Sequence, residues 1–125
     1  MPDKILIVDD EQDILRIVAY SLKKWGYDVI MATNGQEGLD KIASENPDLI
    51  LLDAGMPVMN GFQMLEQLRQ TPDFRNIPVI MLTAHSDPKD IDKARAYGIF
   101  EYVTKPFDPM ELREILEKAL SLSKK

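Results

Sequence analysis

The feature that most constrains the fold of this chain is a series of short, uninterrupted apolar runs. Residues 5–8, 49–52 and 79–82 each form a run of four apolar residues with no polar alternation. Strands that are covered on both faces, as in a parallel sheet, have this pattern. Residues 29–32 and 99–103 are weaker strand candidates, and the glutamate in the latter indicates a less completely covered position. We therefore expect a sheet of five strands.

Segments with the helical period of apolar residues separate these runs. The first has one apolar stripe at i, i+3, i+4, i+7, i+8 and i+11, made by Ile14, Ile17, Val18, Ser21, Leu22 and Trp25. Later segments, around residues 39–43, 62–68, 91–94 and 112–119, predict four more helices, of which the fourth has a thin apolar face. The alternation predicts an α/β fold with a single doubly wound, five-stranded parallel sheet and helices on both faces.

Two dipeptides, Asn34-Gly35 and Asn60-Gly61, resemble hairpin turns. Each is followed by a segment of helical period, so we expect turns that enter helices. The 125 residues fit one domain, spanning 1–125, and contain no repeat or linker.

Composition excludes several classes of function. The chain has no cysteine, which excludes disulfides, thiolate metal sites and a cysteine nucleophile. Its net charge of −6 argues against direct binding of nucleic acid. No apolar run exceeds four residues, so we expect no membrane span, and the start lacks the layout of a signal peptide. A cytoplasmic location is therefore the expectation.

Polar side chains follow four of the five predicted strands. Asp9 and Asp10 come after the first run and Asp53 after the third, whereas Thr83 ends the fourth and Lys105 follows the fifth. In open α/β sheets, ligands bind beyond the carboxyl ends of the strands. We therefore expect these side chains to converge on one rim of the sheet.

Three carboxylates on one rim need a compensating charge. Two unit charges about 4 Å apart repel by about 4 kcal/mol at an effective dielectric constant near 20. A proton on one acid, a neighbouring lysine or a bound cation would offset that repulsion. All-oxygen ligands favour a hard divalent ion, of which Mg2+ is the most plausible. A lysine and a hydroxyl group on the same rim are the other parts that phosphoryl-group chemistry needs.

The sequence resembles the receiver domain of two-component response regulators, and the resemblance covers essentially the whole chain. Four ordered motifs carry it: Ile5-Leu6-Ile7-Val8-Asp9-Asp10-Glu11; Asp53 with Met56-Pro57 and Asn60-Gly61; Val79-Ile80-Met81-Leu82-Thr83-Ala84; and Tyr102-Val103-Thr104-Lys105-Pro106-Phe107. The resemblance implies a flavodoxin-like (βα)5 fold with strand order 2-1-3-4-5.

The resemblance also implies a role for each residue on the rim. Asp53 would be the phosphoryl acceptor, a carboxylate nucleophile that attacks phosphorus on a kinase phosphohistidine. Asp9 and Asp10, with Asp53 and the backbone carbonyl of Gly55, would hold Mg2+. Lys105 would pair with the phosphoryl oxygens.

A switch is implied as well. Thr83 would donate its hydroxyl to the phosphoryl group, and Tyr102 would change rotamer as Thr83 moves. The Lys105-Pro106 bond is a candidate for a cis peptide.

The expected function is therefore a phosphorylation-activated switch in a phosphorelay, which catalyses only its own phosphotransfer and dephosphorylation. A histidine kinase or phosphotransfer protein would act upstream. A downstream effector would bind the face made by the fourth helix, fifth strand and fifth helix. We expect a monomer or a weak phosphorylation-dependent dimer. Whether the chain stands alone or belongs to a longer protein stays open.

Two other functions remain as alternatives: a small Mg2+-dependent aspartyl-phosphate hydrolase and a phosphorylation-independent interaction module. The hydrolases resemble a family with Asp-x-Asp-x-Thr after the first strand, whereas Asp9 and Asp10 are adjacent here. A flavin-binding domain would need a phosphate-cradling loop where this chain has acids. A P-loop enzyme is excluded because its motif is absent.

One departure from the family pattern is Gly55, where relatives commonly carry a larger residue. A missing side chain should open an acyl phosphate on Asp53 to water. We therefore hypothesise that Gly55 and His85, which would flank the site, tune the lifetime of the phosphoryl group.

Overall fold

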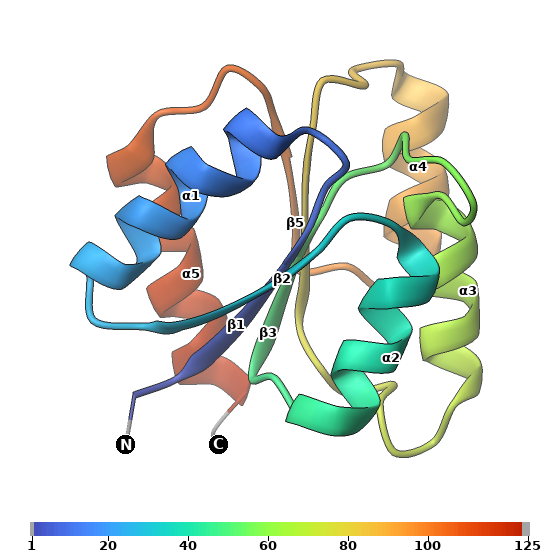
Figure 1. Ribbon diagram of the computed structural model, residues 1–125. Helices are drawn as coiled ribbons and strands as arrows, with labels where there is room; N and C mark the ends of the chain where they lie inside the picture. The colour runs from blue at the N-terminus through green and yellow to red at the C-terminus, as the bar shows by residue number, and fades with distance from the viewer. Residues whose placement is uncertain (1, 124–125) are drawn as a thin grey trace.

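The computed structural model describes residues 2–123, which form one five-stranded parallel sheet between two layers of helices (Figure 1). The strand order is β2-β1-β3-β4-β5. The strands are β1 (Lys4–Val8), β2 (Asp28–Ala32), β3 (Leu49–Leu52), β4 (Val79–Thr83) and β5 (Glu101–Thr104). The helices are α1 (Gln12–Lys24), α2 (Gly35–Glu45), α3 (Gly61–Gln70), α4 (Pro88–Ala96) and α5 (Pro109–Ser123). The predicted α/β fold and its strand order are confirmed.

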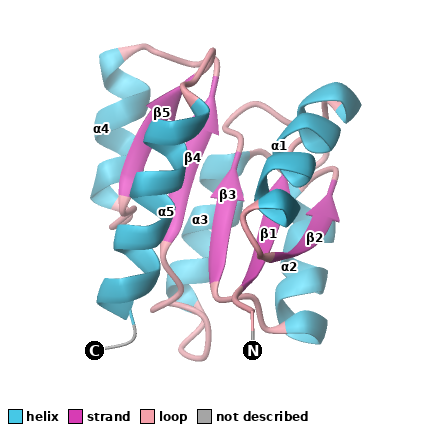
Figure 2. Ribbon diagram, turned by 90° about the vertical axis from the view of Figure 1, so that its left-hand side faces the viewer, coloured by secondary structure: helices cyan, strands magenta, loops and turns pink. Residues whose placement is uncertain are grey.

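The helices divide between the two faces of the sheet. Helices α1 and α5 cover one face, and α2, α3 and α4 cover the other (Figures 1 and 2). The three central strands carry the uninterrupted apolar runs and are almost completely buried, whereas the edge strands β2 and β5 are partly exposed. The less completely covered position that the glutamate of the fifth predicted strand indicated is therefore confirmed. That strand begins later than predicted, at Glu101.

The stripe predicted for α1 was partly wrong. Ile17 is 58% exposed, and the residues that face the sheet are Leu15, Val18, Ala19 and Leu22. Both sets of residues repeat at i, i+3, i+4 and i+7, so the helical period cannot distinguish them. The helix is rotated toward the set that includes Leu15, and Ile17 is left facing outward.

Both Asn-Gly dipeptides begin helices, as predicted. The Asn34 side chain accepts a hydrogen bond from the backbone N–H of Glu37 at 2.8 Å, which caps α2. Asn60 and Gln63 exchange two such bonds in a capping box at the start of α3. A Cβ atom on Gly61 would collide with the carbonyl oxygen of Asp53, so glycine lets α3 start directly against the end of β3.

Helix α4 is weakly attached by apolar contacts. Of its nine residues, Ala94 is buried, so the predicted thin apolar face is confirmed. At its C-terminal end, the guanidinium of Arg69 donates to the carbonyls of Tyr97 at 2.7 Å and Gly98 at 3.2 Å. The same group donates to the carbonyls of Arg75 at 2.8 Å and Ile77 at 3.2 Å. Arg69 therefore joins the loop before β4 to the loop after α4.

Across residues 2–123, the helices are too short or too polar to cross a membrane.

Candidate functional site

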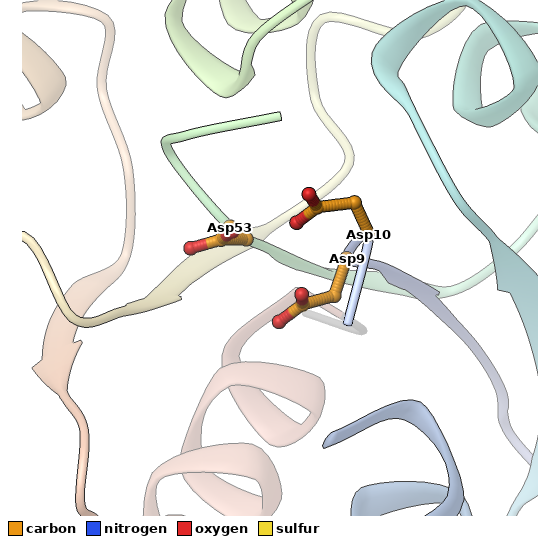
Figure 3. A group of neighbouring side chains, drawn as sticks. All are labelled: Asp9, Asp10 and Asp53. Atoms are coloured by element: carbon orange, nitrogen blue, oxygen red, sulfur yellow. The ribbon is translucent and has the colours of Figure 1, made fainter. Parts of the chain in front are cut away.

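Three carboxylates lie together where β1 and β3 end. Oxygen atoms of Asp9, Asp10 and Asp53 all lie within 4.8 Å of one another. Figure 3 shows Asp9 and Asp10 coming from the end of β1 and Asp53 from the neighbouring strand. The backbone N–H of Asp53 donates to the carbonyl of Val8 at 2.9 Å, and that of Asp9 donates to Ala32 at 3.1 Å. The parallel ladder thus continues past the strands and fixes the carboxylates side by side, as the sequence predicted.

Two of these acids are buried and the third is exposed. Asp9 is 2% exposed and Asp53 is 6% exposed, whereas Asp10 faces solvent. Burial raises the pKa of Asp53, and the charges of Asp9 and Asp10 raise it further. A side-chain hydrogen bond with Thr83 and the charge of Lys105 act in the opposite direction without reversing the shift. Ionised Asp53 is therefore costly for the fold and favours binding of positive charge beside it.

Lys105 supplies positive charge to the buried acids. Its ammonium nitrogen lies 2.6 Å from Oδ2 of Asp9, 3.9 Å from Oδ1 of Asp53 and 4.0 Å from Oε1 of Glu11. The Lys105 side chain is itself only 10% exposed. The bond between Lys105 and Pro106 is cis, as the resemblance implied.

Thr83 and Tyr102 are linked through the backbone of one residue. The buried Thr83 hydroxyl oxygen accepts a hydrogen bond from the N–H of His85 at 3.2 Å. The Tyr102 hydroxyl donates to the carbonyl of His85 at 2.6 Å. Burial raises the pKa of Tyr102, and the charges of Asp90 and Asp53 add to the shift. The two residues predicted to form a switch therefore share His85 as a neighbour.

The His85 imidazole lies over Gly55. A Cβ atom on residue 55 would be 2.6 Å from Nε2 of His85. On the other side of the ring, Nδ1 lies 3.7 Å from Oδ2 of Asp90 in α4, and the His85 side chain is 49% exposed. The sequence predicted that Gly55 and His85 flank the site but did not reveal this contact. It also missed Asp90, which stands among other charged residues of an exposed helix and gives no signal of its own.

The residues at this rim fit a hard divalent cation. Three carboxylates offer oxygen ligands within one small volume, and no softer ligand atom joins them among the residues described. Mg2+ prefers carboxylate oxygens and keeps several of its waters, which the exposed side at Asp10 would accommodate. Within this group, the buried carboxylate of Asp53 has the ammonium of Lys105 and the hydroxyl of Thr83 near it. The arrangement therefore suits transfer of a phosphoryl group to a carboxylate.

Comparison with known proteins gives one consistent family. Residues 5–117 match the response regulator receiver domain. The chain is 41% identical over 123 residues to the alkaline phosphatase synthesis transcriptional regulatory protein PhoP of Bacillus subtilis, covering 98% of this chain and 50% of that protein. It is 42% identical over 109 residues to the response regulator ArlR of Staphylococcus saprophyticus, covering 87% of this chain and 48% of that protein. The chain thus spans about half the length of these relatives.

Solved structures agree with the sequence relatives. A CheY-like response regulator receiver domain protein from Methanospirillum hungatei superposes with a TM-score of 0.93 at 31% identity, covering 99% of this chain and 98% of that one. The chemotaxis protein CheY4 of Vibrio cholerae superposes with a TM-score of 0.89 at 33% identity, covering 95% and 99%.

Proposed function

The chain belongs to the response regulator receiver domain family, and from that premise we propose that it is a phosphorylation-activated switch of two-component signalling with Asp53 as its phosphoryl acceptor. One observation carries the proposal. Asp53 is 6% exposed, lies within 4.8 Å of two further carboxylates and is 3.9 Å from the ammonium nitrogen of Lys105. An acid that served only to stabilise the fold would gain nothing from two further carboxylates at this distance, because like charges repel.

Asp9, Asp10, Asp53 and the backbone carbonyl of Gly55 would hold Mg2+. When bound, Mg2+ supplies positive charge that stabilises the negative charge developing on the transferred phosphoryl group.

The chain's own residues carry out the transfer. An oxygen of Asp53 attacks phosphorus on a phosphohistidine, forming a P–O bond as the P–N bond breaks and its electron pair returns to the imidazole of the donor. Lys105 already has its ammonium within 4 Å of Asp53, so it pairs with the phosphoryl oxygens after little movement. Its bond with Asp9 keeps the ammonium in position before the donor arrives.

The switch follows from what Thr83 and Tyr102 contact. In the unphosphorylated protein, the Thr83 hydroxyl accepts a hydrogen bond from the backbone N–H of His85. A phosphoryl group on Asp53 would offer new acceptor oxygens to that hydroxyl. Movement of Thr83 changes the position of the His85 backbone, whose carbonyl holds the Tyr102 hydroxyl. The new charge then shifts the population between two arrangements of this segment.

We assign the output surface to α4, β5 and α5, because α4 buries little apolar area and can move at low cost. A histidine kinase or phosphotransfer protein is the upstream partner and an effector protein the downstream one. The 125 residues act as one receiver domain in the cytoplasm, as a monomer or a weak phosphorylation-dependent dimer. These 125 residues turn over no external substrate, and their net charge of −6 disfavours direct contact with nucleic acid.

Mass spectrometry of the intact protein tests this proposal. The protein is incubated with a small acyl-phosphate donor and Mg2+, and the mass of one phosphoryl group should appear. The adduct should be absent from Asp53→Asn and after chelation of Mg2+, whereas the exposed control Asp73→Asn should behave as wild type. Modification that survives Asp53→Asn overturns the assignment. Turnover of unrelated phosphomonoesters would instead favour the hydrolase.

A further inference from the structure

Each polar group of His85 has a different neighbour. Its backbone N–H donates to the hydroxyl of Thr83, and its carbonyl accepts from the hydroxyl of Tyr102. Its imidazole lies against Gly55 on one side and reaches Asp90 on the other. One residue therefore contacts the loop after β3, both predicted switch residues and the first half of α4.

The imidazole occupies the space that a side chain at residue 55 would take. A Cβ atom there would lie 2.6 Å from Nε2 and 3.1 Å from Cε1 of His85. These atoms are the far end of a rotatable side chain, so a methyl group at residue 55 would displace the ring and leave the backbone in place. Displacement of the ring would also change its distance of 3.7 Å from Asp90.

Helix α4 depends on such polar contacts because Ala94 alone of its residues is buried. Near the C-terminal end of the helix, the guanidinium of Arg69 donates a hydrogen bond to the carbonyl of Tyr97. In its middle, the Lys93 ammonium lies 4.7 Å from the centre of the Phe62 ring. Toward its N-terminal end, Asp90 lies 3.7 Å from the imidazole of His85, and this contact joins the helix to the loops of the candidate site.

We propose that His85 is a positioning residue that links the phosphoacceptor site to α4, through an imidazole whose position depends on the absence of a side chain at residue 55. The proposal rests on the proposed function. Movement of Thr83 shifts the His85 backbone, the imidazole follows between Gly55 and Asp90, and the N-terminal half of α4 changes its stability.

Amide hydrogen exchange of the whole chain without metal or phosphodonor tests the linkage. His85→Ala and Asp90→Asn should each accelerate exchange in the first half of α4 by about two- to fivefold, which is the range expected for the loss of one weak, exposed polar contact. Exchange in α2, which packs against β1 and β2 near the opposite edge of the sheet, should stay unchanged. Equal exchange in wild type and both variants would overturn the proposal.

Two further variants test separately the contact of the imidazole with residue 55 and its contact with Asp90. His85→Asn keeps a polar nitrogen at the δ position that faces Asp90. It removes Nε2 and Cε1, the ring atoms nearest residue 55. It should retain slow exchange in α4. Gly55→Ala should accelerate α4 exchange in the wild-type background and have no added effect on exchange in the His85→Asn background. Additive effects of Gly55→Ala and His85→Asn would contradict the proposed link.

The linkage and the proposed function fail in different ways. If no adduct forms on the wild-type protein, the proposed function fails, while the exchange comparison of the unmodified variants still decides the positioning role. If an adduct forms, phosphorylation should change α4 exchange in wild type and His85→Asn but not in His85→Ala. An equal change in all three proteins would overturn the link and leave the proposed function standing.

Discussion

The ammonium nitrogen of Lys105 lies 2.6 Å from Oδ2 of Asp9, and both side chains are at least nine-tenths buried. The lysine is therefore paired with one of the three clustered carboxylates, whereas Oδ1 of Asp53 lies 3.9 Å from its nitrogen. Under the proposed function, this arrangement divides the work among the acids: Asp9 holds the lysine in place, and Asp53 would take up the phosphoryl group.

Lys105→Gln should have opposite effects on the cation and on the phosphoryl group. Removal of one positive charge beside Asp9 should tighten binding of Mg2+ by about tenfold, which corresponds to about 1.4 kcal/mol. The same variant should form the adduct more slowly because its phosphoryl oxygens lack the lysine. Calorimetric titration with Mg2+ and the time course of adduct formation measure both effects, with the exposed Lys118→Gln as control. Weaker Mg2+ binding by Lys105→Gln would contradict this description of the charges.

Asp53→Asn should stabilise the metal-free protein at neutral pH. Because burial raises the pKa of Asp53 above 3.8, its protonated form favours the fold at low pH. That contribution is lost as the pH rises through the raised pKa, and above it the ionised carboxylate opposes folding. The Tm of Asp53→Asn should therefore exceed that of wild type at pH 7 in the presence of a chelator. The difference should shrink as the pH falls toward 3.8. A variant no more stable than wild type at pH 7 would show that the buried, ionised carboxylate of Asp53 does not destabilise the fold.

The contact between Gly55 and His85 should control the lifetime of the phosphoryl group. With no side chain at residue 55, the His85 imidazole takes the space beside Gly55. His85→Ala should shorten the half-life of the adduct several-fold, and Gly55→Met should lengthen it by covering Asp53 with a longer side chain. The loss of adduct after removal of the donor gives both rates. Unchanged rates in the two variants would dismiss the hypothesis.

Arg69→Met should destabilise the fold without affecting the chemistry at Asp53. The guanidinium bonds four backbone carbonyls of two loops, and methionine can bond none of them. The loss should cost about 2 kcal/mol of unfolding free energy, as for hydrogen bonds made by a charged group. Urea unfolding measures the loss, and the neighbouring Arg75→Met serves as control because its carbonyl remains. A loss no larger than that of the control would mean that Arg69 is dispensable.

Most of the fold and the acidic site were predictable from the sequence because they depend on local patterns. Uninterrupted apolar runs identify buried parallel strands, and the residues that end them must share a rim. The orientation of α1 was not predictable, since Ile17 and Leu15 lie on stripes of equal period. The contact between His85 and Asp90 could not be predicted from the sequence either. It depends on how α4 packs against the loop that follows β4 and on the absence of a side chain at Gly55.

Formation of an acyl phosphate on Asp53 itself can be detected chemically. Borohydride reduces an aspartyl phosphate to homoserine, so treatment of the phosphorylated protein followed by peptide sequencing in the mass spectrometer identifies the modified residue. We predict homoserine at position 53 alone, only after incubation with both the phosphodonor and Mg2+. Aspartate left intact at position 53, with homoserine at another acid or a phosphoryl group retained on a different side chain, would rule out Asp53 as the phosphoryl acceptor.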